Sequence, residues 1–436
     1  MLLDKDRIII NTLFVLIWVW CTFGFISEEL LPVLQSLRSV VFFLCDAVIV
    51  MLGLIALKDR KDKIVLLLFL AVGYYVTCIY NENSALFYVN GLRDFIYILW
   101  LIPILRYLYN SNLSNEFERR FDRMLFIFLI VQAVCITFQF LKYGANDHGG
   151  GSMGNGFSGV VSMMIYAISF YLMKKRFDGN NVLGSLVENK WLIVLLFPTF
   201  LNETKISFIF LALYFLLLMP FKKESLMKFM IALPLVIVVM YIVFNTYLSA
   251  TGNNDDIMDI DYYLEGYLMA DESNNILDWA EYLYENDELE TDGTTDIPRF
   301  TKYIMIPELN EYYPGHGITG YGIGQFKGGT MIDNSKFYRD NEWLLRGSVP
   351  YGYHAYIQFG FFSVIFFVLF CVRLYSLRRK KTNIEIGIQV LLWSMIVMIM
   401  LYNDFFRYTF VCVIFLYIFT QSLRWNTAET KTIETK

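Results

Sequence analysis

The side chains best suited to acid–base chemistry in this sequence are its three histidines, His148, His316 and His354. His354 lies in the segment YGYHAYIQFG, where a strongly apolar stretch begins. Imidazole titrates near neutral pH, so a histidine at the mouth of an apolar helix could act as a general base. A histidine packed into an interfacial belt of aromatic residues is the alternative, and position alone favours that alternative.

Arg299 and Lys205 are the first candidates for holding an anionic group. Arg299 is the first basic residue after a long acidic stretch, and a guanidinium can bind a phosphate through two parallel hydrogen bonds. Lys205 lies with Glu203 between two short apolar runs, and ionisable groups at membrane depth are functional candidates. A surface charge at Arg299 and a local ion pair between Glu203 and Lys205 are the alternatives. Arg93 and Arg407, near the ends of apolar runs, are weaker candidates.

The glycine-rich segment 315–326 contains GHGITG, which matches the pattern G-x-G-x-x-G. We reject a dinucleotide site, because no strand precedes the pattern and no β-α-β unit surrounds it. The residues GYGIGQF that follow predict a close turn under the membrane surface. We count its Gly322 and Gly324 among the substrate-binding candidates.

Three other patterns carry less weight. Asp259 and Asp261 form the D-x-D of metal-dependent glycosyltransferases, but chance explains it in so acidic a run. Glu28 and Glu29 could supply a catalytic acid, although a solvated turn is the favoured interpretation. The six cysteines all lie in apolar runs, which argues against a disulfide framework or a zinc site. We expect neither metal nor cofactor, and no nucleic acid as a partner.

The elements that must position these residues are membrane helices. Of the 436 residues, 56% are hydrophobic and 18% are charged, whereas a soluble domain has roughly 25% charged residues. Apolar runs near the length of a bilayer span recur along the chain. The sequence predicts an all-α polytopic membrane protein with about twelve spans, near 8–26, 39–57, 64–80, 92–109, 122–141, 156–173, 189–202, 204–220, 227–247, 351–372, 384–402 and 404–422.

Lysine and arginine counts set the predicted orientation. With both termini in the cytoplasm, the cytoplasmic connections hold 25 of the 36 basic residues. A single long helix over 191–220 would invert everything downstream and would place the basic cluster 373–381 outside. We therefore predict a hairpin of two short spans, with Glu203 and Lys205 in a protein-lined pocket below the outer membrane surface.

This topology divides the chain into spans one to nine in 1–247, a large external loop in 248–350, spans ten to twelve in 351–423, and a cytoplasmic tail in 424–436. The loop has two halves. Residues 253–296 hold fifteen carboxylates and no Lys or Arg, and we interpret them as a solvated excursion. The active site is predicted in the half from Arg299 to His354, over the mouth of the helices and beside Lys205.

The order of these elements resembles the bacterial O-antigen polymerase and O-antigen ligase superfamily. The likeness covers nearly the whole chain in architecture and depends on residues 190–360 in its motifs. A hairpin ends in a basic residue, here Lys205. An Arg, here Arg299, precedes a Pro-x-x-G-x-G-x-G-x-F-like turn, and a His, here His354, then opens an apolar run. Two departures are Lys205, where the family often has Arg, and Ala355, where it usually has Asn.

The resemblance implies a GT-C-like glycosyltransferase at the outer face of the bacterial inner (plasma) membrane. It would be a polymerase of O-antigen, capsule or exopolysaccharide that joins repeat units carried on undecaprenyl pyrophosphate. Lys205 and Arg299 would stabilise the leaving lipid pyrophosphate, and His354 would deprotonate the acceptor hydroxyl, without a metal. The implied partners are the lipid-linked oligosaccharide, membrane lipid and a chain-length regulator protein.

Two alternatives stay open. An O-antigen ligase would use the same site to transfer finished glycan to the lipid A core, and the tyrosine-rich, acidic loop favours the polymerase over it. A flippase or exporter belongs to a different class of protein. Transporters place charges across several midplane helices and show internal repeats, whereas the ionisable residues here concentrate at the predicted external face.

Overall fold

The chain is mostly helical in the part that the computed structural model describes. The described residues are 5–95, 97–144, 149–178, 181–202, 206–218, 299–326, 335–345, 347, 349–379 and 382–425. Within these ranges there is no β-strand, and a single isolated bridge is the only extended pairing. His148, Glu203, Lys205, the predicted ninth span 227–247 and the acidic stretch 253–296 lie outside the described residues.

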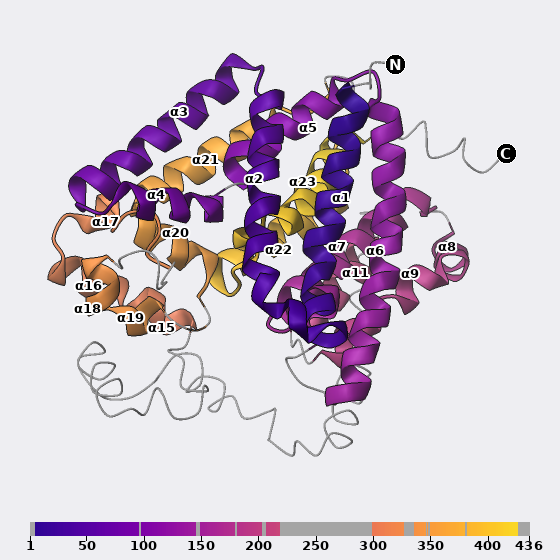
Figure 1. The fold of residues 1–436 in the computed structure, drawn as a ribbon. Helices are drawn as coiled ribbons and strands as arrows, with labels where there is room; N and C mark the ends of the chain where they lie inside the picture. The colour runs from indigo at the N-terminus through magenta and orange to yellow at the C-terminus, as the bar shows by residue number, and fades with distance from the viewer. Residues whose placement is uncertain are drawn as a thin grey trace.

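Most elements are α-helices, and the longer ones form a single bundle (Figure 1). In chain order they are α1 (Lys5–Phe25), α2 (Arg38–Ala56), α3 (Arg60–Tyr74), α4 (Ala85–Gly91), α5 (Ile102–Tyr109), α6 (Ser114–Tyr143), α7 (Ser158–Arg176), α8 (Val182–Glu188), α9 (Lys190–Val194), α10 (Pro198–Leu201), α11 (Ile206–Leu218), α15 (Arg299–Ile304), α16 (Ile306–Tyr312), α17 (His316–Thr319), α18 (Lys336–Asp340), α19 (Glu342–Leu345), α20 (Tyr351–Phe359), α21 (Phe362–Tyr375), α22 (Ile386–Leu401) and α23 (Thr409–Leu423). Short 3-10 or π turns are η1 (Ile26–Leu30), η2 (Pro32–Leu37), η3 (Tyr75–Tyr80), η4 (Leu92–Phe95), η5 (Tyr97–Leu101), η6 (Gly151–Met153) and η7 (Phe405–Arg407).

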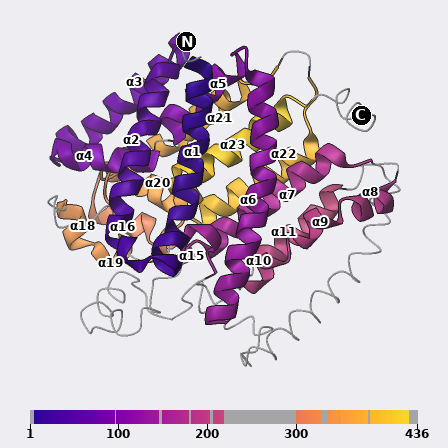
Figure 2. The same cartoon turned by 45° about the vertical axis from the view of Figure 1, so that its right-hand side comes forward.

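Two helices form the centre of the bundle. Every residue of α23 is buried, and α7 is buried from Val160 to Met173. α23 packs against α1, α7 and α22, while α7 also packs against α6 and α11, as two views show (Figures 1 and 2). Both helices are apolar around their whole circumference, which is the pattern of a helix enclosed by others.

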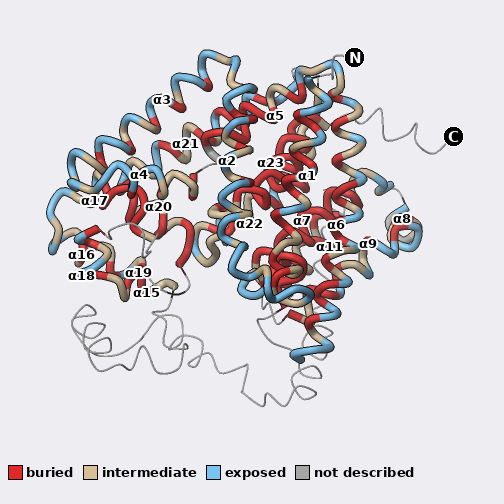
Figure 3. Tube along the Cα trace, viewed as in Figure 1, coloured by how far each residue is buried: buried red, intermediate tan, exposed pale blue. Residues whose placement is uncertain are grey.

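The outer helices α2 and α3 contain many exposed residues (Figure 3), and several of these are apolar. Met51, Leu54 and Leu67 are each more than half exposed. Contiguous exposed apolar surface of this kind is unfavourable in water and suits contact with lipid chains. The coarse prediction of a helical protein with apolar membrane-span candidates is therefore confirmed.

The number of spans is smaller than the prediction in the part of the chain that is described. Four helical segments are long and apolar enough to cross a membrane, Lys5–Leu30, Pro32–Ala56, Arg60–Tyr80 and Ser114–Tyr143. Two bent helix pairs raise the total to six if each counts as one span. The segments Lys190–Leu201, Ile209–Leu218, Ile386–Leu401 and Thr409–Leu423 are apolar but shorter. Twelve spans and a GT-C fold remain predictions.

The tenth predicted span, 351–372, is not one straight helix. α20 and α21 meet at an angle of 117°. Gly360 stands at the junction with φ +54°, and its N–H donates to the Tyr356 carbonyl at 2.6 Å. Glycine adopts this left-handed conformation without a steric cost and so allows the helix to end. α20 therefore becomes a separate short helix that carries His354.

One end of the bundle is held by a network of ion pairs. At one end, buried Asp62 accepts from Arg373 Nη2 at 2.6 Å and lies 3.2 Å from Arg106 Nε. We call this the Asp62 end, and the opposite end the His354 end. Further ion pairs at the Asp62 end are Arg106–Asp59, Lys175–Asp122, Arg379–Glu118 and Arg424–Glu118. Basic residues from connections that the sequence placed on one membrane side thus meet at one end of the fold.

Candidate active site

His354 lies in the first turn of α20, inside the His354 end of the bundle. Pro350 precedes the helix, and the Tyr351 N–H donates to the carbonyl of Asn403 at 2.9 Å. The His354 side chain is fully buried, and its Nε2 lies 3.0 Å from Oδ2 of Asp94 in η4. An imidazole held by a carboxylate is an arrangement by which enzymes orient a general base.

Arg407 extends this pair into a charged cluster. Its Nε lies 3.9 Å from Asp94 Oδ2, and its Nη1 lies 3.4 Å from Asp404. The Tyr408 hydroxyl donates to the same Asp404 carboxylate at 2.7 Å. Asp94 therefore faces both an imidazole and a guanidinium, and this pairing offsets the cost of burying its charge.

The glycine turn 320–326 packs against α20 and η3. The Ile323 N–H donates to Thr77 Oγ1 at 2.8 Å, and the Gly324 N–H donates to Oε1 of Gln358 at 2.7 Å. The other end of the Gln358 amide lies on His354: its Nε2 is 3.2 Å from Nδ1 and 3.0 Å from Nε2 of the ring. Gln358 thus joins the turn to the candidate base.

Gly322 and Gly324 are needed for the shape of this turn. Their φ angles are +94° and +110°, in the region that favours glycine. A Cβ at Gly322 would lie 3.0 Å from the Thr77 Cα, and one at Gly324 would lie 2.9 Å from the Phe87 carbonyl oxygen. The predicted close turn is present, and both glycines face neighbouring protein segments in it.

Aromatic rings enclose His354. The ring centroids of Phe326, Tyr351 and Phe95 lie 4.5, 5.6 and 5.9 Å from that of the imidazole. The predicted alternative was an interfacial histidine beside an aromatic belt. The ring has aromatic neighbours, as that alternative expects, but it also has a carboxylate partner, which adds a chemical capacity that packing alone would not need. The imidazole is therefore fully buried in this structure.

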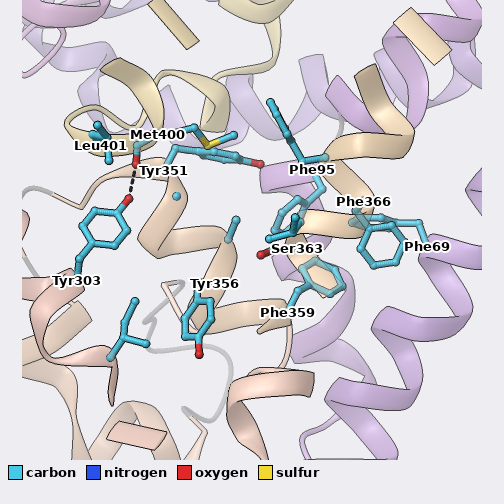
Figure 4. A pocket seen from close by; sticks show the side chains of 15 residues that line it. Phe69, Phe95, Tyr303, Tyr351, Tyr356, Phe359, Ser363, Phe366, Met400 and Leu401 are labelled. Atoms are coloured by element: carbon cyan, nitrogen blue, oxygen red, sulfur yellow. Dashed lines mark hydrogen bonds between the residues drawn. The ribbon is translucent and has the colours of Figure 1, made fainter. Parts of the chain in front are cut away.

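An apolar pocket of about 400 Å³ lies beside this cluster, under the bend between α20 and α21 (Figure 4). Tyr351 of α20 and Phe95 line it and also contact the His354 ring, so these aromatic side chains separate the pocket from His354. The other lining residues are Phe69, Tyr303, Ile306, Gly352, Ala355, Tyr356, Phe359, Ser363, Val364, Phe366, Phe367, Met400 and Leu401. A space of this size and character suits a hydrocarbon chain.

Tyr303 anchors the predicted catalytic half of the loop to this pocket. Its hydroxyl donates to the Met400 carbonyl at the end of α22 (Figure 4). The same hydroxyl accepts the Tyr353 N–H at 2.9 Å. One helical turn earlier, the guanidinium of Arg299 lies 3.8 Å from the ring centroid of Tyr402. Arg299 therefore lies on the same helix as a residue that lines the pocket.

The remaining predicted candidates that are described lie elsewhere. Arg93 forms an ion pair with Asp46, at 2.9 and 3.0 Å. Glu28 pairs with Arg38 and accepts the Asn155 N–H at 2.6 Å. This places Glu28 in a link between two connections of the bundle.

His316 and Glu29 are also held by protein groups. His316 Nε2 lies 3.1 Å from Asn81 Oδ1, and its ring stacks on Tyr321 at 4.7 Å. Glu29 accepts from Lys142 at 2.8 Å. Both residues thus have partners other than the Asp94–His354 pair.

The hairpin candidates Glu203 and Lys205 lie outside the described residues, but the residue before them is placed. Asn202 is fully buried, and its Nδ2 donates to the Gly149 carbonyl at 3.2 Å and to Ser162 Oγ at 3.0 Å. A polar side chain satisfied in this way inside an apolar bundle fixes the position of the segment that carries it. The end of the first predicted hairpin span, where the turn begins, is therefore anchored on α7 and the glycine-rich segment before it.

Sequence reasoning missed Asp94 and Gln358. A signal existed for each: Asp94 is an acidic residue in the predicted span 92–109, which is costly unless it is paired, and Gln358 lies four residues after His354 on one helix face. Only the fold could show that these side chains meet. Among the described residues no three His, Cys, Asp or Glu side chains lie together as metal ligands would.

Comparison with known proteins does not identify a family for this chain. No protein-family model matches the chain, and no curated protein matches it. The resemblance to the O-antigen polymerase and ligase superfamily therefore stays an expectation drawn from the residues.

Proposed function

We propose that this protein is a membrane glycosyltransferase that polymerises lipid-linked repeat units of a surface polysaccharide. The observation that carries the proposal is the buried Asp94–His354 pair, with Arg407 beside it, next to an apolar pocket at one end of a bundle of membrane-span candidates. Glycosyl transfer from a lipid pyrophosphate needs a base for the acceptor, fixed positive charge for the leaving group, and room for the lipid.

In the proposed reaction His354 takes the proton of the acceptor hydroxyl. The acceptor oxygen then bonds to the anomeric carbon of the donor, and the bond from that carbon to the pyrophosphate oxygen breaks. Arg299, Lys205 and Arg407 would stabilise the charge that grows on the pyrophosphate. Arg407 is a stronger candidate than Arg93 for contact with the pyrophosphate, because Arg407 lies within 4 Å of the carboxylate that contacts His354.

The apolar pocket supports a lipid-linked donor over a free sugar nucleotide. The first isoprenoid units of a polyprenyl carrier would occupy the space under the α20–α21 bend, with the pyrophosphate toward Arg299. The site would face outward on the bacterial inner membrane if the orientation predicted from the basic residues holds.

Deletion of the gene followed by gel analysis of surface polysaccharide tests this function. A polymerase predicts loss of the ladder and a product with one repeat unit. Free lipid-linked polymer with unmodified lipid A core would indicate a ligase instead, and accumulation of repeat units on the inner leaflet would indicate a flippase. Either result would overturn the proposal.

Complementation of the deletion assigns the residues. His354→Ala should abolish polymer, and unchanged polymer length and yield would remove the base assignment. Lys205→Arg should keep activity while Lys205→Ala loses it, because phosphate binding needs the charge. Equal activity of these two variants would remove Lys205 from the site.

A further inference from the structure

The position of Asp94 decides which nitrogen of His354 can act as a base. Its Oδ2 lies 3.0 Å from Nε2 of the imidazole, and Arg407 Nε lies 3.9 Å from the same oxygen. A carboxylate only accepts hydrogen bonds, so the ring nitrogen that faces it must carry a proton. A neutral imidazole has one protonated nitrogen, and its other nitrogen holds the lone pair.

We propose that Asp94 is the positioning residue of His354: it holds the proton on Nε2, so that Nδ1 is the basic nitrogen. This inference rests on the proposed function for its catalytic meaning, although the proton position is a property of the protein alone. In the reaction the acceptor O–H bond breaks as an Nδ1–H bond forms, while Nε2–H stays with Asp94. The resulting imidazolium is stabilised by the carboxylate.

The side-chain amide of Gln358 contacts the face of the same imidazole ring. One amide nitrogen can lie 3.0 and 3.2 Å from the two ring nitrogens only above the plane of the ring, not in line with either lone pair. Its Oε1 is fixed by the Gly324 N–H. The amide therefore restrains the tilt of the imidazole and leaves the choice of protonated nitrogen to Asp94.

Nitrogen-15 spectroscopy tests the proton position directly. The chain has three histidines, so 15N-histidine labelling of the full protein in detergent gives few signals, and His354→Gln identifies those of His354. The expected spectrum at neutral pH has a protonated-type Nε2 and an unprotonated-type Nδ1. A proton on Nδ1 in the wild-type protein would overturn the proposal.

The Asp94→Asn variant provides a second test. An amide can either donate a hydrogen bond to the ring or accept one from it, so it no longer requires a proton on Nε2. The expected result is a shift of the His354 proton from Nε2 toward Nδ1, with Asp94→Glu restoring the wild-type pattern. Asp122→Asn removes a carboxylate that contacts Lys175 and Tyr417 instead, and it should leave the His354 signals unchanged. An unchanged spectrum in Asp94→Asn would contradict the role of Asp94.

The third test measures the enzymatic activity of the Asp94 variants. Asp94→Asn should lower kcat about 10²–10⁴-fold, the usual contribution of a general base, with a smaller change in KM and partial rescue by Asp94→Glu. An Asp94→Asn protein with wild-type kcat would overturn the positioning role. If the protein proved not to be a polymerase, the spectroscopic result on His354 would still stand. The proposed function and the proposed role of Asp94 can therefore fail independently.

Discussion

Gln358 ties the glycine turn to His354 through the two ends of one amide: its Oε1 accepts the Gly324 N–H at 2.7 Å, and its Nε2 rests on the imidazole. The backbone reinforces the link, because the Gly322 N–H donates to the Gln358 carbonyl at 3.1 Å. Any displacement of the turn should therefore reach the histidine. This coupling gives the glycines a role that does not require contact with substrate.

Replacing Gly324 with Ala should displace the turn. The left-handed φ costs about 1–3 kcal/mol for a residue with a Cβ, and the new methyl group would also meet the Phe87 carbonyl at 2.9 Å. Gly156→Ala is a matched control, because Gly156 has φ +82° and a Cβ added there would have nothing within 4 Å. Thermal unfolding in detergent should show a larger loss for Gly324→Ala, and equal losses would contradict the packing argument.

Removing the carboxylate of Asp62 should strongly destabilise the opposite end of the bundle. Asp62→Asn leaves Arg373 and Arg106 without their shared counter-charge, and breaking a buried pair costs about 3–5 kcal/mol. Glu116→Gln is the control, since its partners Arg7, at 3.8 Å, and Arg120, at 3.6 Å, have side chains that are 59% and 36% exposed, and such surface pairs contribute about 0–1 kcal/mol. Denaturant unfolding measures both, and similar small losses would show that the Asp62 network is dispensable.

The ring of Tyr402 should hold Arg299 in place for the donor. Tyr402→Phe keeps an aromatic face under the guanidinium and should leave activity near wild type. Tyr402→Leu removes a cation–π contact of about 0.5–2 kcal/mol, which corresponds to roughly 2- to 30-fold in KM for the lipid-linked donor. Equal KM values for the Phe and Leu variants would show that the contact does not position Arg299.

Because of Tyr303, we expect the free energy of unfolding to fall at alkaline pH. Burial raises the pKa of its hydroxyl to about 12, whereas the unfolded chain releases this proton near pH 10. The folded state then retains a proton that the unfolded state has lost, so stability is full below about pH 10 and falls as pH rises toward 12, by up to roughly 3 kcal/mol.

Tyr303→Phe isolates this effect. The variant should be less stable at neutral pH by about 1 kcal/mol, because it loses the hydrogen bonds to the Met400 carbonyl and the Tyr353 N–H. The difference in free energy of unfolding between the variant and the wild type should narrow above pH 10. Urea unfolding at several pH values measures this difference. Parallel stability curves for the two proteins would contradict the assignment.

Much of the helical architecture could be predicted from hydropathy and charge alone. The apolar runs near 8–26, 39–57, 64–80 and 122–141 became helices, because twenty apolar residues satisfy their backbone only as a helix in lipid. The bend at Gly360 could not be predicted, since a glycine in an apolar run is equally compatible with a continued helix. It depends on the 317–320 segment, whose Gly317 carbonyl accepts the Phe361 N–H at 3.0 Å.

Hydropathy, basic-residue counts and residue types were enough to predict the class of protein, the distribution of basic residues between the connections, and His354, Arg299 and the glycine turn as candidates. Which groups lie together depends on how distant helices pack. Asp94 reaches His354 across 260 positions of the chain, whereas Arg93, its neighbour in sequence, turns to Asp46. Residue type and local period fix which helices form and which faces are apolar, but a buried polar group finds its partner only when packing brings distant helices together.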